Sequence, residues 1–324
     1  MQLFRPEENL TKGSSHLRYD ETTCTAPRSN ARAPCAGGKP LIRDYIALTK
    51  PRITWLILMS TGIGYFFGAH GAWDWIALLH TLIGTGLIAS GTAALNQWYE
   101  RDADARMHRT RNRPIPAGRI AAVNALWFAA ALSLIGFLEL WWGANPLTGI
   151  LGALTLLVYL FVYTPLKQKS WHATTIGAVP GAMPPLIGYA GAAAQLTPEA
   201  WILFAILFLW QFPHFYSIAW MYREDYARGG IRMLPVVEPD GDSTVRQILA
   251  CSLALIPISL LPRYFGMAGN LYLGGALLLG LAYFYAGLQA SRDRTRARAR
   301  AILLTSVIYL PILYGLMMAD RPHL

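Results

Sequence analysis

From Ile53 to about Met318, the chain alternates long apolar stretches with short polar segments. Each stretch is close to the roughly 20 residues that a helix needs to cross a hydrocarbon layer of about 30 Å. Because no water inside a bilayer can satisfy free backbone groups, such stretches must be helical there. The pattern predicts an all-α, polytopic membrane protein with about nine transmembrane helices. The expected helices cover approximately residues 53–71, 75–98, 121–141, 146–165, 172–191, 200–221, 247–265, 269–290 and 300–318.

The first 40 residues follow a different pattern, with serine, proline and glycine among charges of both signs and no apolar period. Such a segment buries too little apolar surface to fold alone. It lacks the apolar core of a secretory signal, and Glu7 and Glu8 do not suit a transit peptide, which is poor in acids. We therefore expect residues 1–40 to form a flexible cytoplasmic tail that is not cleaved, and residues 41–324 to form the transmembrane domain.

The composition agrees with a membrane protein, since 54% of the residues are hydrophobic and only 14% are charged. An ordinary soluble domain has roughly 25% charged residues. Three widely spaced cysteines exclude a secreted disulfide scaffold and imply no zinc site. A net charge of +10 is also found in nucleic-acid-binding proteins, but most lysines and arginines here lie in loops between apolar stretches. That placement indicates membrane topology and no nucleic acid partner.

The charge of the loops alternates along the chain. The basic loops are 99–120, 166–171, 222–246 and 291–300. The loops with almost no lysine or arginine lie near residues 72–74, 142–145, 192–199 and 264–268. With an odd number of helices, every basic loop falls on one side of the membrane. The positive-inside rule then predicts a bacterial inner-membrane protein with a cytoplasmic N-terminus and a periplasmic C-terminus.

The polar segment after the second expected helix carries oxygen-bearing side chains at a regular spacing. Asn96, Glu100 and Asp104 recur every four residues, so a helix places them on one face over about 12 Å. Like charges at this spacing repel each other, and at a membrane edge they are costly unless a cation lies among them. Oxygen ligands suit Mg²⁺, which typically binds one or two carboxylates together with water and substrate phosphate. The spacing therefore predicts Mg²⁺ and a diphosphate substrate.

Four arginines that follow this row could neutralise phosphate oxygens that the metal does not reach. They are Arg106, Arg109, Arg111 and Arg113. The alternative is a polar cytoplasmic loop whose acids simply balance its arginines. Asp102 fits the row least, because an unbroken helix turns it about 200° away from Glu100 and Asp104. We place Asp102 at an unwound helix end.

A second polar cluster ends the sixth expected helix on the same side. Residues 213–226 contain His214 and the adjacent acids Glu224 and Asp225. Two acidic clusters on one membrane face could hold metal ions from opposite sides of one diphosphate. In the alternative interpretation, the two acids form a solvated cap with neighbouring arginines, and His214 is a hydrogen-bonded packing residue.

Together these segments resemble the UbiA superfamily of intramembrane prenyltransferases, whose first motif reads Asn-x-x-x-Asp-x-x-x-Asp. Asn96, Glu100 and Asp104 match this motif with one Asp-to-Glu exchange, which retains the carboxylate. Within the superfamily the chain is most similar to the protohaem IX farnesyltransferases, over about residues 41–318. The segments that carry this similarity are 48–52, 100–107, 163–167, 181–185, 210–215 and 233–237.

The resemblance implies transfer of the farnesyl group of farnesyl diphosphate to a vinyl group of haem B, with addition of water, giving haem O and diphosphate. It implies Mg²⁺ as cofactor, with ligands from Asn96, Glu100, Asp104 and Asp225. The catalytic residues that it implies are Asn96, Glu100, Asp104, Arg109 and Lys167. The substrate-binding residues are Lys50, Arg52, Asp102, Arg113, Tyr163, His214, Phe215, Tyr216, Glu224 and Asp225. Besides the two substrates and the bilayer, expected partners are haem A synthase or the cytochrome oxidase assembly machinery.

Two other functions remain open at this point. The first is a UbiA-type prenyltransferase that uses the same metal chemistry on an aromatic acid or a quinone precursor. The second, from a different class, is a membrane transporter or assembly scaffold without catalysis.

Overall fold

The computed structural model describes residues 42–71 and 73–322, and within these residues it contains helices and no β-strand. The all-α prediction is therefore confirmed. The expected tail, residues 1–40, lies outside the described residues.

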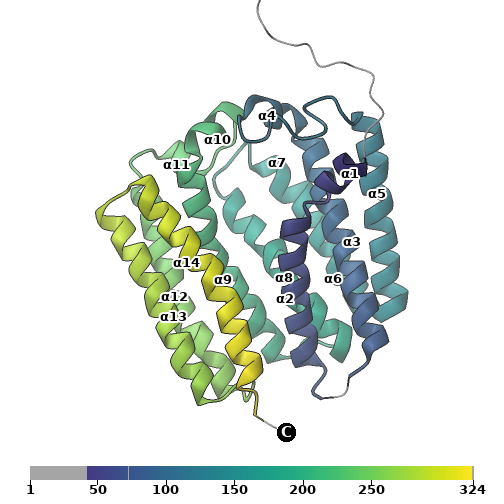
Figure 1. Cartoon of the computed structure of the whole chain (residues 1–324), viewed down its shortest axis with the longest axis vertical. Coiled ribbons are helices and arrows are strands. Elements are labelled where there is room, and N and C mark those ends of the chain that lie inside the picture. The colour runs from purple at the N-terminus through teal and green to yellow at the C-terminus, as the bar shows by residue number, and fades with distance from the viewer. Residues whose placement is uncertain (1–41, 72, 323–324) are drawn as a thin grey trace, which may run out of the picture. The chain divides into compact units, whose positions relative to one another are not determined.

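Nine long helices form the body of the described residues (Figure 1). They are α2 (Pro51–Gly68), α3 (Trp75–Tyr99), α5 (Ala122–Leu138), α6 (Pro146–Leu157), α8 (Ala173–Ala193), α9 (Pro198–Met221), α12 (Asp242–Tyr264), α13 (Asn270–Arg292) and α14 (Arg296–Ala319). π-helical turns extend two of them, with η1 (Glu139–Ala144) after α5 and η2 (Val158–Tyr163) after α6. The short helix α7 (Thr164–Leu166) follows η2.

Four further short helices lie with α7 at one end of the bundle (Figure 1). They are α1 (Ile42–Leu48), α4 (Arg101–Arg106), α10 (Arg223–Gly229) and α11 (Leu234–Val237). The basic loops predicted for the cytoplasmic side connect these helices, so one end of the bundle carries most of the arginines.

Seven helical segments of the described chain are long and apolar enough to cross a membrane. They begin at Trp75, Ala122, Pro146, Pro198, Asp242, Asn270 and Arg296. Helices α2 and α8 lie at two further expected positions, but they are not among the helices that are both long and apolar enough to cross a membrane. The count of nine spans is therefore not confirmed. Large apolar side chains such as Trp127, Phe161 and Leu278 stay exposed on the bundle surface, as expected for a multi-pass membrane protein that faces lipid.

Helix α8 has the composition of a helix that packs against protein. Most of its residues are buried, and it contacts α2, α3, α6 and α9. Glycines allow α2 to approach it closely, because a Cβ at Gly188 would collide with the backbone carbonyl of Thr61, and one at Gly64 with that of Pro185. Small residues at such crossings let helix backbones meet in a membrane.

Candidate functional site

A cavity of about 620 Å³ lies at the end of the bundle where the short helices gather. We call it the central cavity. Nine residues predicted from the sequence to bind metal or substrate line it. They are Lys50, Asn96, Glu100, Asp104, Arg109, Arg113, Tyr163, Lys167 and Phe215.

The acidic row keeps helical spacing across a helix junction. Helix α3 ends at Tyr99, Glu100 stands between the two helices, and α4 begins at Arg101. The Glu100 N–H still donates to the Asn96 carbonyl at 2.9 Å, and the Asp104 N–H donates to the Glu100 carbonyl at 2.8 Å. Asn96, Glu100 and Asp104 are all buried and face the central cavity.

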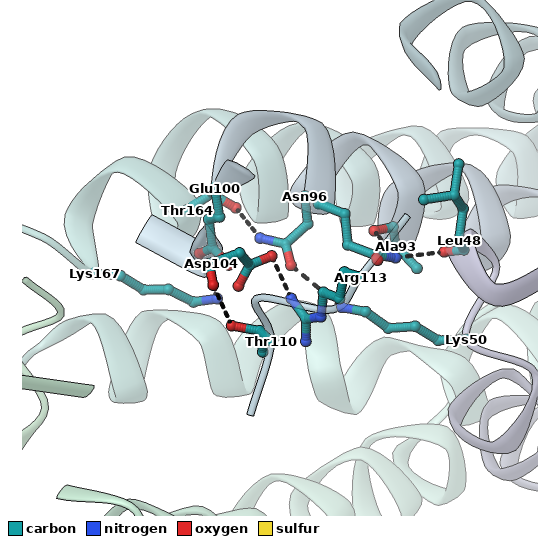
Figure 2. A network of polar contacts seen from close by, with 11 residues as sticks. Leu48, Lys50, Ala93, Asn96, Glu100, Asp104, Thr110, Arg113, Thr164 and Lys167 are labelled. Atoms are coloured by element: carbon teal, nitrogen blue, oxygen red, sulfur yellow. Dashed lines mark hydrogen bonds and ion pairs between the residues drawn. The ribbon is translucent and has the colours of Figure 1, made fainter. Parts of the chain in front are cut away.

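A base from another part of the chain contacts each member of this row (Figure 2). The Lys167 ammonium donates to Glu100 Oε1 at 2.8 Å, and Arg113 Nη1 donates to Asp104 Oδ2 at 2.6 Å. Lys50 Nζ lies 3.4 Å from Asn96 Oδ1. Three separate chain segments therefore bring a cation to one polar surface.

Lys50 reaches the central cavity from a turn with an unusual backbone. Its φ of 49° and ψ of 59° are left-handed, which few residues other than glycine adopt. Pro51 follows and starts α2. Such strained conformations cluster at functional sites.

The protonation of these groups reflects burial and mutual repulsion. Burial and the nearby cations of Arg113 and Lys167 lower the pKa of Lys50 to about 7. Burial alone would raise the pKa of Glu100, but the charge and hydrogen bond of Lys167 outweigh it and lower that pKa. Burial works against the charged form of Lys167 as well, and Glu100 overcomes it and raises the pKa of Lys167. A ligand with several negative charges would relieve the repulsion among these cations.

Two tyrosines form an aromatic wall beside Lys167. Its ammonium lies 4.4 Å from the ring centre of Tyr163 and 6.0 Å from that of Tyr159. The two rings meet edge to face, with centres 4.8 Å apart. Tyr159 also lines the central cavity and was not predicted, although its spacing of four residues from Tyr163 is a sequence signal for a shared helix face.

Asp225 is buried beside the central cavity and does not line it. Its two carboxylate oxygens accept the backbone N–H groups of His108 and Arg109 at 2.9 and 3.0 Å. Burial would raise its pKa, but the hydrogen bond from Arg228 and these backbone donors lower the pKa to about 2. Asp225 thus anchors the loop that carries Arg109, and its role as a metal ligand stays a prediction.

Other predicted residues lie away from the central cavity. His214 Nδ1 contacts Ser306 Oγ at 2.8 Å, and its ring stacks on Trp210. Tyr216 is fully buried in the apolar core. The cavity-facing side of α9 is instead formed by Phe215 and Ile218, which are three residues apart as helical periodicity requires.

Three charged residues of the predicted set are exposed and do not line the central cavity. They are Arg52, Asp102 and Glu224. The placement of Asp102 at an unwound helix end was wrong, since Asp102 lies within α4 and points outward with 81% of its side chain exposed. Glu224 lines a neighbouring cavity. Substrate roles for these three residues, and for His214 and Tyr216, stay predictions.

The donor set of the central cavity fits Mg²⁺. Among residues 42–71 and 73–322, no three His, Cys, Asp and Glu side chains form a complete metal site. Mg²⁺ does not need one, because it commonly binds one or two carboxylates and takes its other ligands from substrate phosphate and water. Asp104 Oδ1 is buried without a hydrogen-bond partner, as expected for an oxygen that would bind a cation.

A narrow apolar groove of about 140 Å³ adjoins the central cavity. The two share Lys50, Ile53 and Tyr159. The groove continues between α2, α3 and α8 along Ile57 and Ile187. A ligand with an anionic head and a hydrocarbon tail would fit both spaces at once.

Comparisons with a family model and with similar proteins agree on one protein family. The chain matches the UbiA prenyltransferase family over residues 57–309. It is 64% identical to the protoheme IX farnesyltransferase of Solibacter usitatus, over 87% of this chain and 100% of that relative. It is 46% identical to the protoheme IX farnesyltransferase of Koribacter versatilis, over 89% of this chain and 96% of that relative.

Solved structures give the same fold. A structure of digeranylgeranylglyceryl phosphate synthase has a TM-score of 0.73 at 17% identity, covering 86% of this chain and 98% of that chain. A UbiA homolog from Archaeoglobus fulgidus bound to DMAPP and Mg²⁺ has a TM-score of 0.66 at 17% identity, covering 87% of this chain and 100% of that chain. At these identities, the two structures support the fold alone.

Proposed function

This chain belongs to the UbiA prenyltransferase family, and from that premise we propose that it transfers the farnesyl group of farnesyl diphosphate to a vinyl group of haem B. Water adds in the same reaction, and the products are haem O and diphosphate. The names of the relatives that are 64% and 46% identical support this assignment of substrates. The observation that carries the chemistry is the row of Asn96, Glu100 and Asp104 facing Lys50, Arg113 and Lys167 in one cavity.

The bases of the central cavity suit the leaving group. When the bond between farnesyl C1 and the diphosphate oxygen breaks, negative charge develops on diphosphate. Lys50, Arg109, Arg113 and Lys167 line the cavity, and fixed cations stabilise charge that develops in a water-poor site. Asn96, Glu100 and Asp104 would hold Mg²⁺, which when bound polarises phosphoryl oxygens as a Lewis acid.

The aromatic wall formed by Tyr159 and Tyr163 suits the farnesyl fragment that remains when diphosphate leaves. An allylic cation remains on the farnesyl chain, and ring faces attract cations without bonding to them. Tyr159 and Tyr163 already attract the Lys167 ammonium in this way. The farnesyl tail would lie in the apolar groove, and a vinyl carbon of haem attacks farnesyl C1. Water then bonds to the carbocation formed on the vinyl group and releases a proton, so no protein nucleophile is needed.

The proposal also covers location and partners. Basic loops gather at the end of the bundle that holds the central cavity, which favours a cytoplasmic N-terminus and a periplasmic C-terminus in a bacterial inner membrane. A product destined for terminal oxidases favours contact with haem A synthase or with cytochrome oxidase assembly factors.

Reconstitution tests the substrate assignment. The protein in lipid nanodiscs is incubated with Mg²⁺, farnesyl diphosphate and either haem B or 4-hydroxybenzoate, and products are identified by mass spectrometry. Farnesylated haem with unmodified 4-hydroxybenzoate is expected. Prenylated 4-hydroxybenzoate without haem O would instead assign an aromatic substrate. Release of no diphosphate with either acceptor would favour a transporter or scaffold.

A further inference from the structure

A second cavity of about 610 Å³ lies against the loop of His108 and Arg109, which also lines the central cavity. We call it the basic pocket. Five arginines and only two acidic residues line it. The arginines are Arg109, Arg223, Arg228, Arg294 and Arg296. Because Arg109 also lines the central cavity, the two spaces share a wall.

Two of these arginines are fixed by carboxylates. Arg228 pairs with Asp225 at 2.6 Å, and Arg294 pairs with Asp242. In the part of the chain that the structure describes, Arg109, Arg223 and Arg296 have no carboxylate within ion-pair distance. The basic pocket therefore contains three guanidinium groups that can bind an anion.

Aromatic rings hold these three guanidinium groups in place. Arg109 lies 5.4 Å from the ring centre of Tyr222, and Arg296 lies 5.9 Å from the same ring. Arg223 lies 5.1 Å from the ring of Trp220. Stacking of this kind orients a planar guanidinium and does not use its N–H groups. Arg223 Nη1 donates to the Pro239 carbonyl at 3.4 Å, and its other N–H groups can still bind an anion.

We propose that the basic pocket binds the two propionate carboxylates of the haem substrate. The inference rests on the proposed function, since it assigns a place to that acceptor. Guanidinium groups recognise carboxylates through paired, charge-assisted hydrogen bonds. The vinyl groups of haem lie on the edge of the ring away from the propionates, so a haem held here would bring its vinyl edge to the central cavity by extending past Arg109, which lines both spaces. Arg223 and Arg296 determine acceptor specificity and take no part in diphosphate departure.

The test compares haem B with its dimethyl ester, in which both propionates are neutral. Haem binding is followed by absorbance in phosphatidylcholine nanodiscs without farnesyl diphosphate, so this readout does not depend on turnover. The wild-type protein, Arg223→Gln with Arg296→Gln, and the control Arg300→Gln are measured. Arg300 is exposed on α14 and does not line the basic pocket.

For the wild type and the Arg300→Gln control, we expect esterification to raise the Kd of haem by about tenfold or more, the scale of one lost charge-assisted hydrogen bond. In the double variant, the Kd for haem B should rise, and esterification should raise it further by a clearly smaller factor than in the wild type, because Arg109 is then the one unpaired arginine left among those that line the pocket. The KM for farnesyl diphosphate should stay unchanged in all three proteins. Equal discrimination against the ester by the double variant would overturn the propionate assignment.

A second measurement distinguishes haem propionates from the headgroups of anionic lipids as the ligand of the basic pocket. Adding phosphatidylglycerol to the nanodiscs should leave the haem Kd of the wild type within about twofold. Strong competition by this lipid, with no effect of esterification, would assign the basic pocket to lipid headgroups and overturn the inference. Absence of haem binding and of haem O formation by the wild type would contradict the proposed function itself.

Discussion

Each acidic side chain of the central cavity is paired with a base, one from a distant segment and one from the loop that follows the acidic row. Glu100 pairs with Lys167 across 67 positions of sequence, and Asp104 pairs with Arg113. Pairs that are buried are costly to break, because the remaining partner keeps its charge without compensation. These ion pairs compensate the buried charges of the central cavity until a charged substrate enters it.

Glu100→Gln and Asp104→Asn are expected to lower haem O formation by about 100-fold or more, because each removes a carboxylate that would hold the Mg²⁺ that stabilises the leaving group. The rate is measured on protein in nanodiscs at saturating substrates. Asp293→Asn is the matched control, since Asp293 is exposed on the surface. Normal turnover by both cavity variants would contradict the role given to the acidic row.

Asp225→Ala is expected to loosen the loop at His108 and Arg109, because both backbone donors lose their acceptor. Hydrogen exchange of these two amides should become about tenfold faster, as for loss of one net hydrogen bond. Asp225→Asn keeps one acceptor oxygen and should show a smaller effect. A large rise in the Mg²⁺ concentration needed for turnover, with unchanged exchange, would support Asp225 as a metal ligand instead.

At the scale of elements, the crossing of α2 and α8 sets the wall of the apolar groove. Both helices line that groove, and their backbones meet where Gly64 and Gly188 leave room. The prolines inside α8 are buried, and neighbouring helices can supply partners for the backbone groups that proline frees.

Gly188→Ala is expected to destabilise the protein by about 1 to 3 kcal/mol, since the added methyl group must push the two backbones apart. Gly62→Ala on α2 is the control, because a Cβ there meets nothing within 4 Å. Thermal unfolding in the same detergent gives the comparison. Similar melting temperatures for the two variants would contradict the close approach of α2 and α8.

The sequence predicted the long helices because lipid requires continuous apolar length. It predicted the common face of Asn96, Glu100 and Asp104 because that face lies on a single helical stretch. Spacing along one segment carries no information on contacts between segments, and so the pairing of Lys167 with Glu100 could not be derived. The same limit applies to the basic pocket, where α10 and α14 contribute Arg223 and Arg296.

At the scale of the whole molecule, three spaces of different chemistry are adjacent. The central cavity is cationic and polar, the apolar groove extends from it between helices, and the basic pocket lies across the loop of Arg109. A lipid-soluble diphosphate and an anionic acceptor could therefore enter by different faces and meet at the central cavity.

The positions of the first and last described helices give a prediction of membrane topology. Helix α1 lies at the end that holds the short helices, and α14 finishes at the opposite end (Figure 1). Alkaline phosphatase fused to the C-terminus is expected to be active, because it folds in the oxidising periplasm. A fluorescent protein at the same position should stay dark. The reverse pattern would contradict the proposed orientation.

Mass spectrometry of extracted haem tests the central claim most directly. A bacterial strain without its own haem O synthase expresses this protein, and its membranes are compared with those of the same strain carrying an empty vector. The account predicts a haem heavier than haem B by one farnesyl group and one water, found only when the protein is present. Unchanged haem B in membranes that contain the intact protein would contradict it.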